Sequence, residues 1–184
     1  MLKNIIEKIN ELLKTGGQVF VAIDGDAAAG KSTLGGELAA HFNCPLIQMD
    51  DFFLPPALRT PARMAEAGGN VDYERFKKEV LEPLLDGQPF SFRPFDCKVM
   101  DFVDEKSYKP SSLTIIEGAY SLHPSLNEAY SFKIFMQIDK EEQKKRILTR
   151  NGEEMLEKFL NIWIPMEKRY HEAFNVRQMC DVVI

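Results

Sequence analysis

The stretch from Gly25 to Ser32 constrains this chain more than any other feature of its sequence. It fits the pattern G-x-x-x-x-G-K-[ST], and it lies between an apolar run, Val19 to Ile23, and a helix-like segment that begins at Lys31. Glycines at both ends let backbone N–H groups curl around phosphate oxygens, and the start of the following helix attracts negative charge. This order of strand, loop and helix predicts a phosphate-binding turn in an α/β fold.

The residues of this loop have distinct expected parts in binding a nucleotide. Lys31 would reach the β- and γ-phosphates and assist catalysis, and the Ser32 hydroxyl would coordinate Mg²⁺. The alternative, a chance match to the pattern, is disfavoured because a strand and a helix flank the motif in the right order. The residues expected to bind the nucleotide are Gly25, Asp26, Ala27, Ala28, Ala29, Gly30, Lys31, Ser32 and Thr33.

Apolar runs alternate with helix-like segments along the whole chain. The runs at 19–23, 46–49, 113–116, 132–138 and 182–184 predict five strands, and helical spacing predicts helices over 1–14, 31–42, 72–86, 140–150 and 153–174. This alternation is typical of a three-layer α/β sandwich, a parallel sheet of about five strands with helices on both faces. Pro165 predicts a kink in the last helix. The apolar stripe of that helix is interpreted as core: Met155, Phe159, Ile162, Trp163, Met166, Tyr170 and Phe174.

Composition limits the kinds of partner. The 184 residues fit a single domain, 1–184, and the net charge of −5 gives no basic excess for a nucleic acid. No run approaches the roughly 18 apolar residues that a membrane span needs. Three widely spaced cysteines form no metal-binding pair, so we expect a reducing, cytoplasmic setting. A homo-oligomer remains open, because apolar patterning does not separate a monomer from a dimer.

Carboxylates follow two of the predicted strands. Asp50 and Asp51 come after the run at 46–49, and Glu117 ends the run at 113–116. A phosphate-bound Mg²⁺ needs such acidic oxygen ligands to complete its shell. Side chains alternate along an extended strand, so only one of the two aspartates is expected to face the phosphates. The alternative is that an aspartate here only caps a turn.

These motifs together resemble the uridine kinase and phosphoribulokinase-like branch of the P-loop kinases. The resemblance covers nearly the whole chain, and it implies a P-loop NTPase fold that uses ATP and Mg²⁺. The implied activity is transfer of the γ-phosphoryl group to a hydroxyl of a nucleoside or a similar small molecule. The motifs that carry it are Gly25 to Ser32, Asp50-Asp51-Phe52-Phe53, Asn70-Val71-Asp72, Ile116-Glu117-Gly118 and the closing Cys180-Asp181-Val182-Val183-Ile184.

The resemblance also assigns roles to single residues. It makes Asp50 the general base and a metal-binding residue, places Glu117 with Ser32 on Mg²⁺, and brings Asp72 to the hydroxyls of a sugar-like acceptor. Tyr73, Arg93 and Phe95 are expected on the same acceptor side, where Phe95 could stack. The Tyr and His with which uridine kinases read a pyrimidine are missing from this part of the sequence. The identity of the acceptor therefore stays open.

Two segments are expected to close over the substrates. The stretch 54–71, rich in proline and glycine, is too long for an ordinary connection and predicts a substrate-covering loop. Arg146 and Arg150 lie four residues apart where the related kinases carry an arginine-bearing lid, which implies a short lid at 146–153 and a catalytic role for both arginines. The alternative for these arginines is a solvated helix surface.

Two other functions remain possible for a nucleotide-binding chain of this kind. One is a GTP-dependent switch, but the sequence contains neither the D-x-x-G nor the N-K-x-D pattern that such switches use. The other is a P-loop ATPase that acts on a macromolecular partner. The long segment 54–71 suits a closed pocket for a small acceptor better than either alternative.

Overall fold

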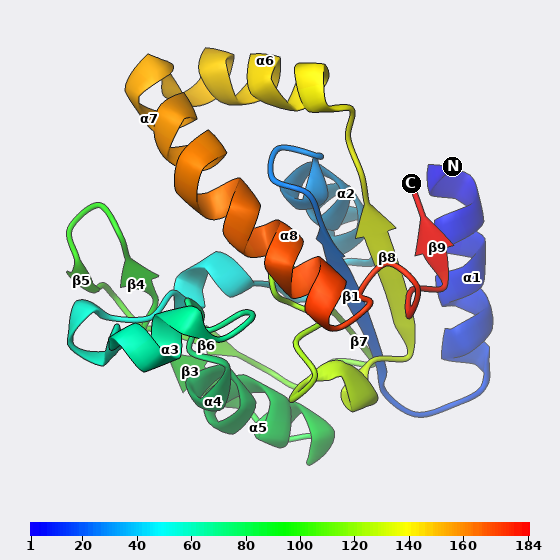
Figure 1. The fold of residues 1–184 in the computed structure, drawn as a ribbon. Coiled ribbons are helices and arrows are strands. Elements are labelled where there is room, and N and C mark those ends of the chain that lie inside the picture. Colours follow the sequence, from blue (N-terminus) through cyan, green and yellow to red (C-terminus); the bar gives the residue numbers. More distant parts are fainter.

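Five parallel strands form the central sheet of the computed structural model, which describes residues 1–184 (Figure 1). Their order is β2-β7-β1-β8-β9, and the central strand β1 is buried along its whole length. A parallel sheet covered on both faces requires such continuous apolar strands. The predicted five-stranded parallel sheet is confirmed. The strands are β1 (Val19–Gly25), β2 (Leu46–Gln48), β7 (Leu113–Glu117), β8 (Phe132–Met136) and β9 (Val182–Val183).

Alternate side chains of the sheet face two different layers of helices. On one face, Val21 and Ile115 join a core that includes Ile9 of α1 (Leu2–Lys14) and Leu38 of α2 (Lys31–Phe42). On the other face, Phe20 and Ile116 pack in a second core, with residues of α4 (Tyr73–Phe76), α5 (Glu82–Leu85) and α8 (Ile164–Ala173). The two separate cores make the molecule a three-layer sandwich, as the sequence predicts.

Two long helical segments, α4–α5 and α7 (Glu153–Lys158)–α8, each contain one wide π-helical turn. The turn Lys77–Leu81 joins α4 to α5, and the turn Phe159–Trp163 joins α7 to α8. A proline follows each turn by two residues, Pro83 in the first helix and Pro165 in the second. A proline ring collides with the carbonyl four residues earlier, and the wider turn relieves that collision. The irregularity predicted at Pro165 is therefore present as a π turn.

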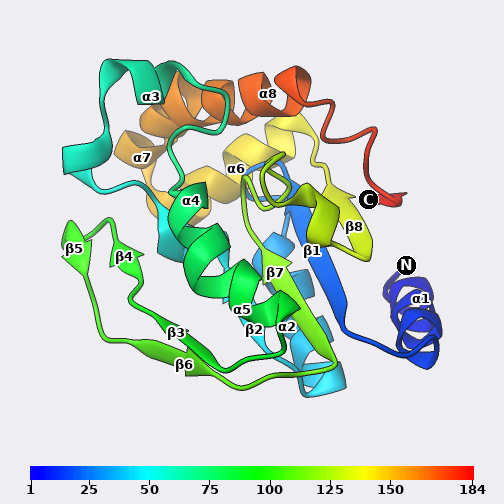
Figure 2. The same cartoon turned by 90° about the horizontal axis from the view of Figure 1, so that it is seen from below.

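The segment between α5 and β7 contains two short antiparallel strand pairs that the sequence analysis did not predict. β3 (Phe90–Phe92) pairs with β6 (Lys106–Tyr108), and β4 (Phe95–Asp96) pairs with β5 (Asp101–Phe102). Figure 2 shows these pairs on the far side of the molecule from α1. Two or three residues are too few for an alternation pattern to stand out in a sequence.

The remaining helices are short or lie at the edge of the sandwich. α3 (Pro61–Ala65) belongs to the segment 54–71, and α6 (Lys140–Asn151) precedes α7. Single 3₁₀ turns occur at Met49–Phe52, Pro56–Leu58 and Asn127–Ala129. None of the helices is both long enough and apolar enough to cross a membrane.

Candidate active site

A cavity of about 790 Å³ lies where β1, β2 and β7 end. The loop after β1 forms one wall, and Asp50 and Glu117 approach from the ends of β2 and β7. The segment 53–70, the β4–β5 turn and the helices α6 to α8 supply the other walls. Ligands of open parallel sheets bind at this carboxyl edge, so the cavity is the candidate active site.

The loop after β1 has the form of a phosphate cradle. Gly25 and Gly30 have positive φ angles of 133° and 102°, and a Cβ atom on Gly25 would collide with the backbone oxygen of Met136. The Lys31 ammonium donates hydrogen bonds to the carbonyl oxygens of Gly25 and Asp26, both at 2.8 Å. Five backbone N–H groups donate to no acceptor within the protein, and together they can receive phosphate oxygens. They belong to Ala28, Gly30, Lys31, Ser32 and Thr33.

The structure brings together two of the residues predicted to hold Mg²⁺. The Ser32 hydroxyl, in the first turn of α2, donates to Oε2 of Glu117 at 3.2 Å, and the Gln48 amide donates to Oε1 at 3.2 Å. Burial raises the pKa of the Glu117 carboxyl, and the negative charge of Asp50 adds to that rise. A hydroxyl and a carboxylate at this spacing fit Mg²⁺, which takes its other ligands from phosphates and water. The chain has no cluster of three or more His, Cys, Asp or Glu side chains that could bind a metal alone.

Asp50 is the one aspartate of its pair that lines the cavity. The side chain of Asp51 turns away and forms an ion pair with Lys106 at 2.6 Å. This separation was expected, but its cause differs, because both residues lie in a 3₁₀ turn and not in an extended strand. Surrounding protein raises the pKa of the Asp50 carboxyl, whereas the positive charges of Lys31 and Arg150 act in the opposite direction.

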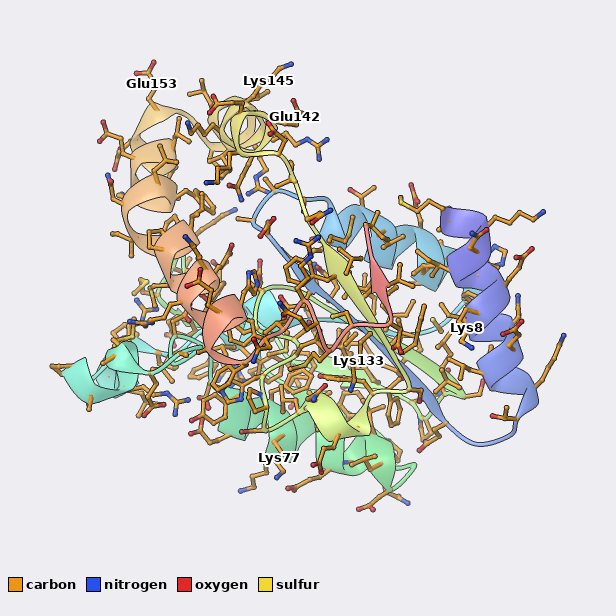
Figure 3. All side chains as sticks on the ribbon, turned by 45° about the vertical axis from the view of Figure 1, so that its right-hand side comes forward. Lys8, Lys77, Lys133, Glu142, Lys145 and Glu153 are labelled. Atoms are coloured by element: carbon orange, nitrogen blue, oxygen red, sulfur yellow. The ribbon has the colours of Figure 1, made fainter.

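Arg146 and Arg150 both line the cavity from α6. Arg146 donates to Glu142 at 2.8 Å and to the carbonyl oxygen of Ala28, in the phosphate loop, at 3.3 Å. In contrast, Lys145 of the same helix points away from the body of the molecule, as does Glu153 at the α6–α7 corner (Figure 3). Cations held beside the phosphate loop are placed to stabilise phosphate charge, and the catalytic role of the two arginines stays a prediction.

The segment 54–71 forms a closed loop against the cavity. Its ends are joined by a hydrogen bond from the Leu54 amide to the carbonyl oxygen of Asn70 at 3.0 Å. Arg169 of α8 holds the other side, donating to the carbonyl oxygens of Met64 and Glu66, both at 3.0 Å. Three residues of the segment line the cavity, namely Arg59, Met64 and Asn70.

Asp72 and Tyr73, expected on the acceptor side, lie outside the cavity. Asp72 caps the first turn of α4 by accepting a hydrogen bond from the Arg75 amide at 3.0 Å, and it is only 8% exposed. The Tyr73 ring stacks on His123 with 3.9 Å between ring centroids, and its hydroxyl accepts a hydrogen bond from Arg63 at 2.7 Å. Protein groups hold both side chains in this structure, and their contact with the acceptor stays a prediction.

Arg93 and Phe95 also lie outside the cavity. Arg93 donates to the carbonyl oxygens of Val103 and Phe102 at 3.0 and 2.8 Å, which fixes the base of the β4–β5 pair. Phe95 is buried and packs edge-on against Phe102 with 5.5 Å between ring centroids. The turn between these strands instead brings Cys97 and Met100 to the cavity. The expected substrate contacts of Arg93 and Phe95 stay a prediction, and in this structure the adjacent turn lies nearer the cavity.

The apolar stripe of α7 and α8 is only in part a core surface. Tyr170 is fully buried and Phe174 packs against the core, as expected. The rest of the stripe lines the cavity and joins neither hydrophobic core, so interpreting it as core is wrong there: Met155, Phe159, Ile162, Trp163 and Met166. Periodicity shows that one face of a helix is apolar, but it does not distinguish a core from a cavity wall.

Glu167 is a site residue that the sequence analysis missed. Its carboxylate, on α8, accepts a hydrogen bond from the Ala27 amide of the phosphate loop at 2.9 Å, and the Gln143 side chain donates to the Ala27 carbonyl oxygen at 2.9 Å. Burial raises the pKa of Glu167 to about 7, although the positive charge of Lys31 opposes the rise. The only signal in the sequence that could have indicated Glu167 as a site residue is its spacing of four residues from Trp163. This spacing places Glu167 and Trp163 on the same face of the helix.

Comparisons with known proteins agree with this arrangement at the level of fold. No protein-family model matches the sequence, and no curated protein is similar enough to count as a relative. A possible uridine kinase from Bacillus stearothermophilus shares 18% identity with a TM-score of 0.72, over 98% of this chain and 99% of its own. A D-glycerate 3-kinase from Cryptococcus neoformans shares 13% identity with a TM-score of 0.66, over 94% of this chain and 89% of its own.

A third solved structure extends the comparison to yeast. YFH7 from Saccharomyces cerevisiae, a proposed P-loop kinase with a circular permutation, shares 13% identity with a TM-score of 0.68. The match covers 100% of this chain and 98% of that chain. These neighbours are of the same kind as the proteins that the sequence motifs resemble. The chain has the α/β fold of the P-loop kinases.

Proposed function

We propose that this protein is an ATP-dependent kinase that phosphorylates a hydroxyl group of a small molecule. The observation that carries the proposal is the convergence of three groups on one cavity: the open phosphate loop, the Ser32–Glu117 pair and the Asp50 carboxylate. A phosphate site alone would suit any nucleotide-binding protein. A carboxylate that faces the same space adds a group able to take a proton from an acceptor.

Different residues of the cavity have different roles in the proposed phosphoryl transfer. ATP would supply the phosphoryl group, and Ser32 and Glu117 would hold Mg²⁺, which would neutralise charge on the phosphate oxygens. Asp50 accepts the proton as the acceptor oxygen bonds to the γ-phosphorus and the bond from that phosphorus to the ADP oxygen breaks. The raised pKa of Asp50 improves it as a base, because proton transfer is most effective when the pKa approaches the working pH.

Positive charge surrounds the path of the transferred group. Lys31 is held by two carbonyl oxygens of its own loop, at a position from which its ammonium can turn to the β- and γ-phosphates. Arg146 and Arg150 approach from α6, on another side of the cavity. The protein is expected to stabilise charge mainly by placing such cations in advance.

The walls of the cavity favour a small acceptor over water or a macromolecule. The closed loop 54–71 and the helices α7 and α8 surround the space next to Asp50, and half of the lining side chains are apolar. Such walls exclude water, which would otherwise compete for the phosphoryl group.

The proposal is tested by ADP release from Mg·ATP with a panel of hydroxyl compounds that includes nucleosides, pantothenate, sugar phosphates and simple alcohols. Lys31→Ala serves as the blank, and Lys145→Ala, an exposed lysine on α6, serves as the matched control. The expected result is release that depends on one acceptor, is retained in Lys145→Ala and is lost in Lys31→Ala. Equal, slow release with every compound would contradict the proposal.

A further inference from the structure

The apolar wall of the candidate active site is larger than nucleotide phosphates or a metal ion require. Ile162 of the α7–α8 helix is 49% exposed, and Met100 of the β4–β5 turn is 44% exposed, although both line the cavity. Proteins rarely leave large apolar side chains gathered around a concave surface unless a ligand or partner covers them. The wall belongs to the same cavity as Asp50, so a molecule that covers it lies within reach of the groups proposed to act in catalysis.

Side chains of the α7–α8 helix form one part of this wall. Phe159 and Trp163 lie edge to face with 4.7 Å between ring centroids, and Ile162 stands beside them. Met155 and Met166 extend the surface at either end. Aromatic rings and flexible methionines make a surface that binds flat or extended apolar groups and offers them few hydrogen bonds.

The other walls near Asp50 are also apolar. Phe53 follows the 3₁₀ turn that carries Asp50, Met64 lies on α3, and Met100 lies in the β4–β5 turn. Figure 1 shows α3 and the β4–β5 pair on the same side of the molecule as α7. Apolar groups from four separate parts of the chain thus lie around the space next to Asp50, the proposed base.

Two polar side chains, Arg59 and Asn70, lie among these apolar groups. Arg59 uses its Nε–H on the carbonyl oxygen of Leu54 at 2.7 Å, and Oδ1 of Asn70 is buried without a hydrogen-bond donor. These two side chains can pair with one or two hydroxyl groups of a ligand, whereas a sugar with several hydroxyls would leave the others without partners against the apolar wall, which weakens binding. A molecule with one reacting hydroxyl and an apolar body would lose almost nothing.

We infer that the cavity takes an acceptor whose hydroxyl group is attached to an apolar body, such as an alkyl chain or an aromatic ring, that lies against Phe159, Ile162 and Trp163. The inference rests on the proposed kinase function, because the hydroxyl must reach Asp50. In the transfer, the acceptor O–H bond breaks, its proton passes to Asp50, and the oxygen forms the bond to the γ-phosphorus as ADP leaves. The products are ADP and the phosphate monoester of the alcohol.

The test uses 1-butanol, 1-hexanol and 1-octanol, with glycerol, ribose and uridine as polar counterparts. ADP release from Mg·ATP and the phosphate monoester, detected by mass spectrometry, report turnover. Titration calorimetry in the presence of Mg·ADP reports binding of each compound. The inference predicts that binding and kcat/KM both rise by about fourfold for each added methylene group, as expected for burial of a CH₂ group. Phosphorylation of ribose, glycerol or uridine in preference to 1-octanol would overturn it.

A matched pair of variants identifies the occupant of the wall. Ile162→Asn places a polar group in the wall, and Leu160→Asn makes the same change on the same turn outside the cavity, where Leu160 is 37% exposed. Both positions are exposed, so both variants should fold. Ile162→Asn is expected to lose 1-octanol binding by about tenfold or more while Mg·ADP affinity stays unchanged, and Leu160→Asn should bind both like the parent.

The outcomes separate this inference from the proposed function. Loss of Mg·ADP affinity in Ile162→Asn would mean that the wall holds the base of the nucleotide, and the inference would be wrong. No ADP release with any compound would overturn the kinase proposal, and calorimetry would still decide the inference. Equal binding of 1-octanol and ribose would overturn it in either case.

Discussion

Glu167 provides the sharpest physical test of the site, because a buried carboxyl group contacts the phosphate loop. The side chain is 8% exposed, and its carboxylate accepts the Ala27 N–H at 2.9 Å. Glu167→Gln removes the ionisable group and keeps an oxygen that can accept the same hydrogen bond. The variant therefore isolates the free energy of ionising this carboxyl group in its buried position.

The expected size of this free energy follows from the pKa of Glu167. Burial raises the pKa of Glu167 from its ordinary value of 4.5 to about 7, so the native state holds this proton more tightly than the unfolded chain does. The protonated Glu167 carboxyl group makes its whole contribution to the free energy of unfolding below pH 4.5. This contribution falls as pH rises towards 7 and is lost above pH 7. The loss amounts to about 3 kcal/mol of unfolding free energy.

Urea unfolding at several values between pH 4.5 and pH 8 measures this contribution. The free energy of unfolding of Glu167→Gln, minus that of the parent, should rise by up to about 3 kcal/mol across this range. Glu172→Gln, an exposed glutamate on the same helix, should show no such rise. A difference in unfolding free energy between Glu167→Gln and the parent that stays constant with pH would refute the argument. Ionising the buried carboxyl group would then not destabilise the folded protein.

Three further substitutions test the rest of the account. Asp50→Asn should lower kcat by about 10²- to 10⁴-fold and leave the calorimetric Kd of Mg·ATP unchanged, and turnover like the parent's would exclude Asp50 as the base. Glu117→Gln should raise the Mg²⁺ concentration for half-maximal activity by about tenfold, and an unchanged Mg²⁺ titration would remove Glu117 from the metal site. Ile115→Ala, in the fully buried centre of β7, should lower the unfolding free energy by about 2–5 kcal/mol in urea, and a loss below about 1 kcal/mol would contradict its place in the core.

The sheet was predictable because its strands are buried on both faces. Val19 to Ile23 is an uninterrupted apolar run, and Leu113 to Ile116 is apolar except for Thr114. The chain must pass through helices to bring these strands together in parallel. The pairs β3–β6 and β4–β5 were not predictable, because two or three residues leave no periodic signal. Their contacts come from aromatic packing, as between Phe90 and Tyr108, whose ring centroids lie 5.2 Å apart.

The site was predictable where chemistry fixes the spacing of residues along the chain. The phosphate loop, with Ser32, and the strand end at Glu117 meet in the structure because parallel strands end at one edge of the sheet. The sequence does not show whether Asp72 binds a ligand or caps a helix, because an aspartate before a helix serves equally well as a cap, and here it accepts the N–H of Arg75. Glu167 was missed because its contact with Ala27 spans 140 residues.

The fate of the γ-phosphoryl group tests the central claim most directly. ATP labelled with ³²P at the γ-position is incubated with the protein, Mg²⁺ and the acceptor that gives the largest ADP release, with Lys31→Ala in parallel. The account predicts that the label appears in a phosphate monoester of the acceptor, in an amount equal to the ADP formed, and that both products vanish in Lys31→Ala. Label found only in inorganic phosphate would contradict the account and show that water, not an enclosed alcohol, receives the phosphoryl group.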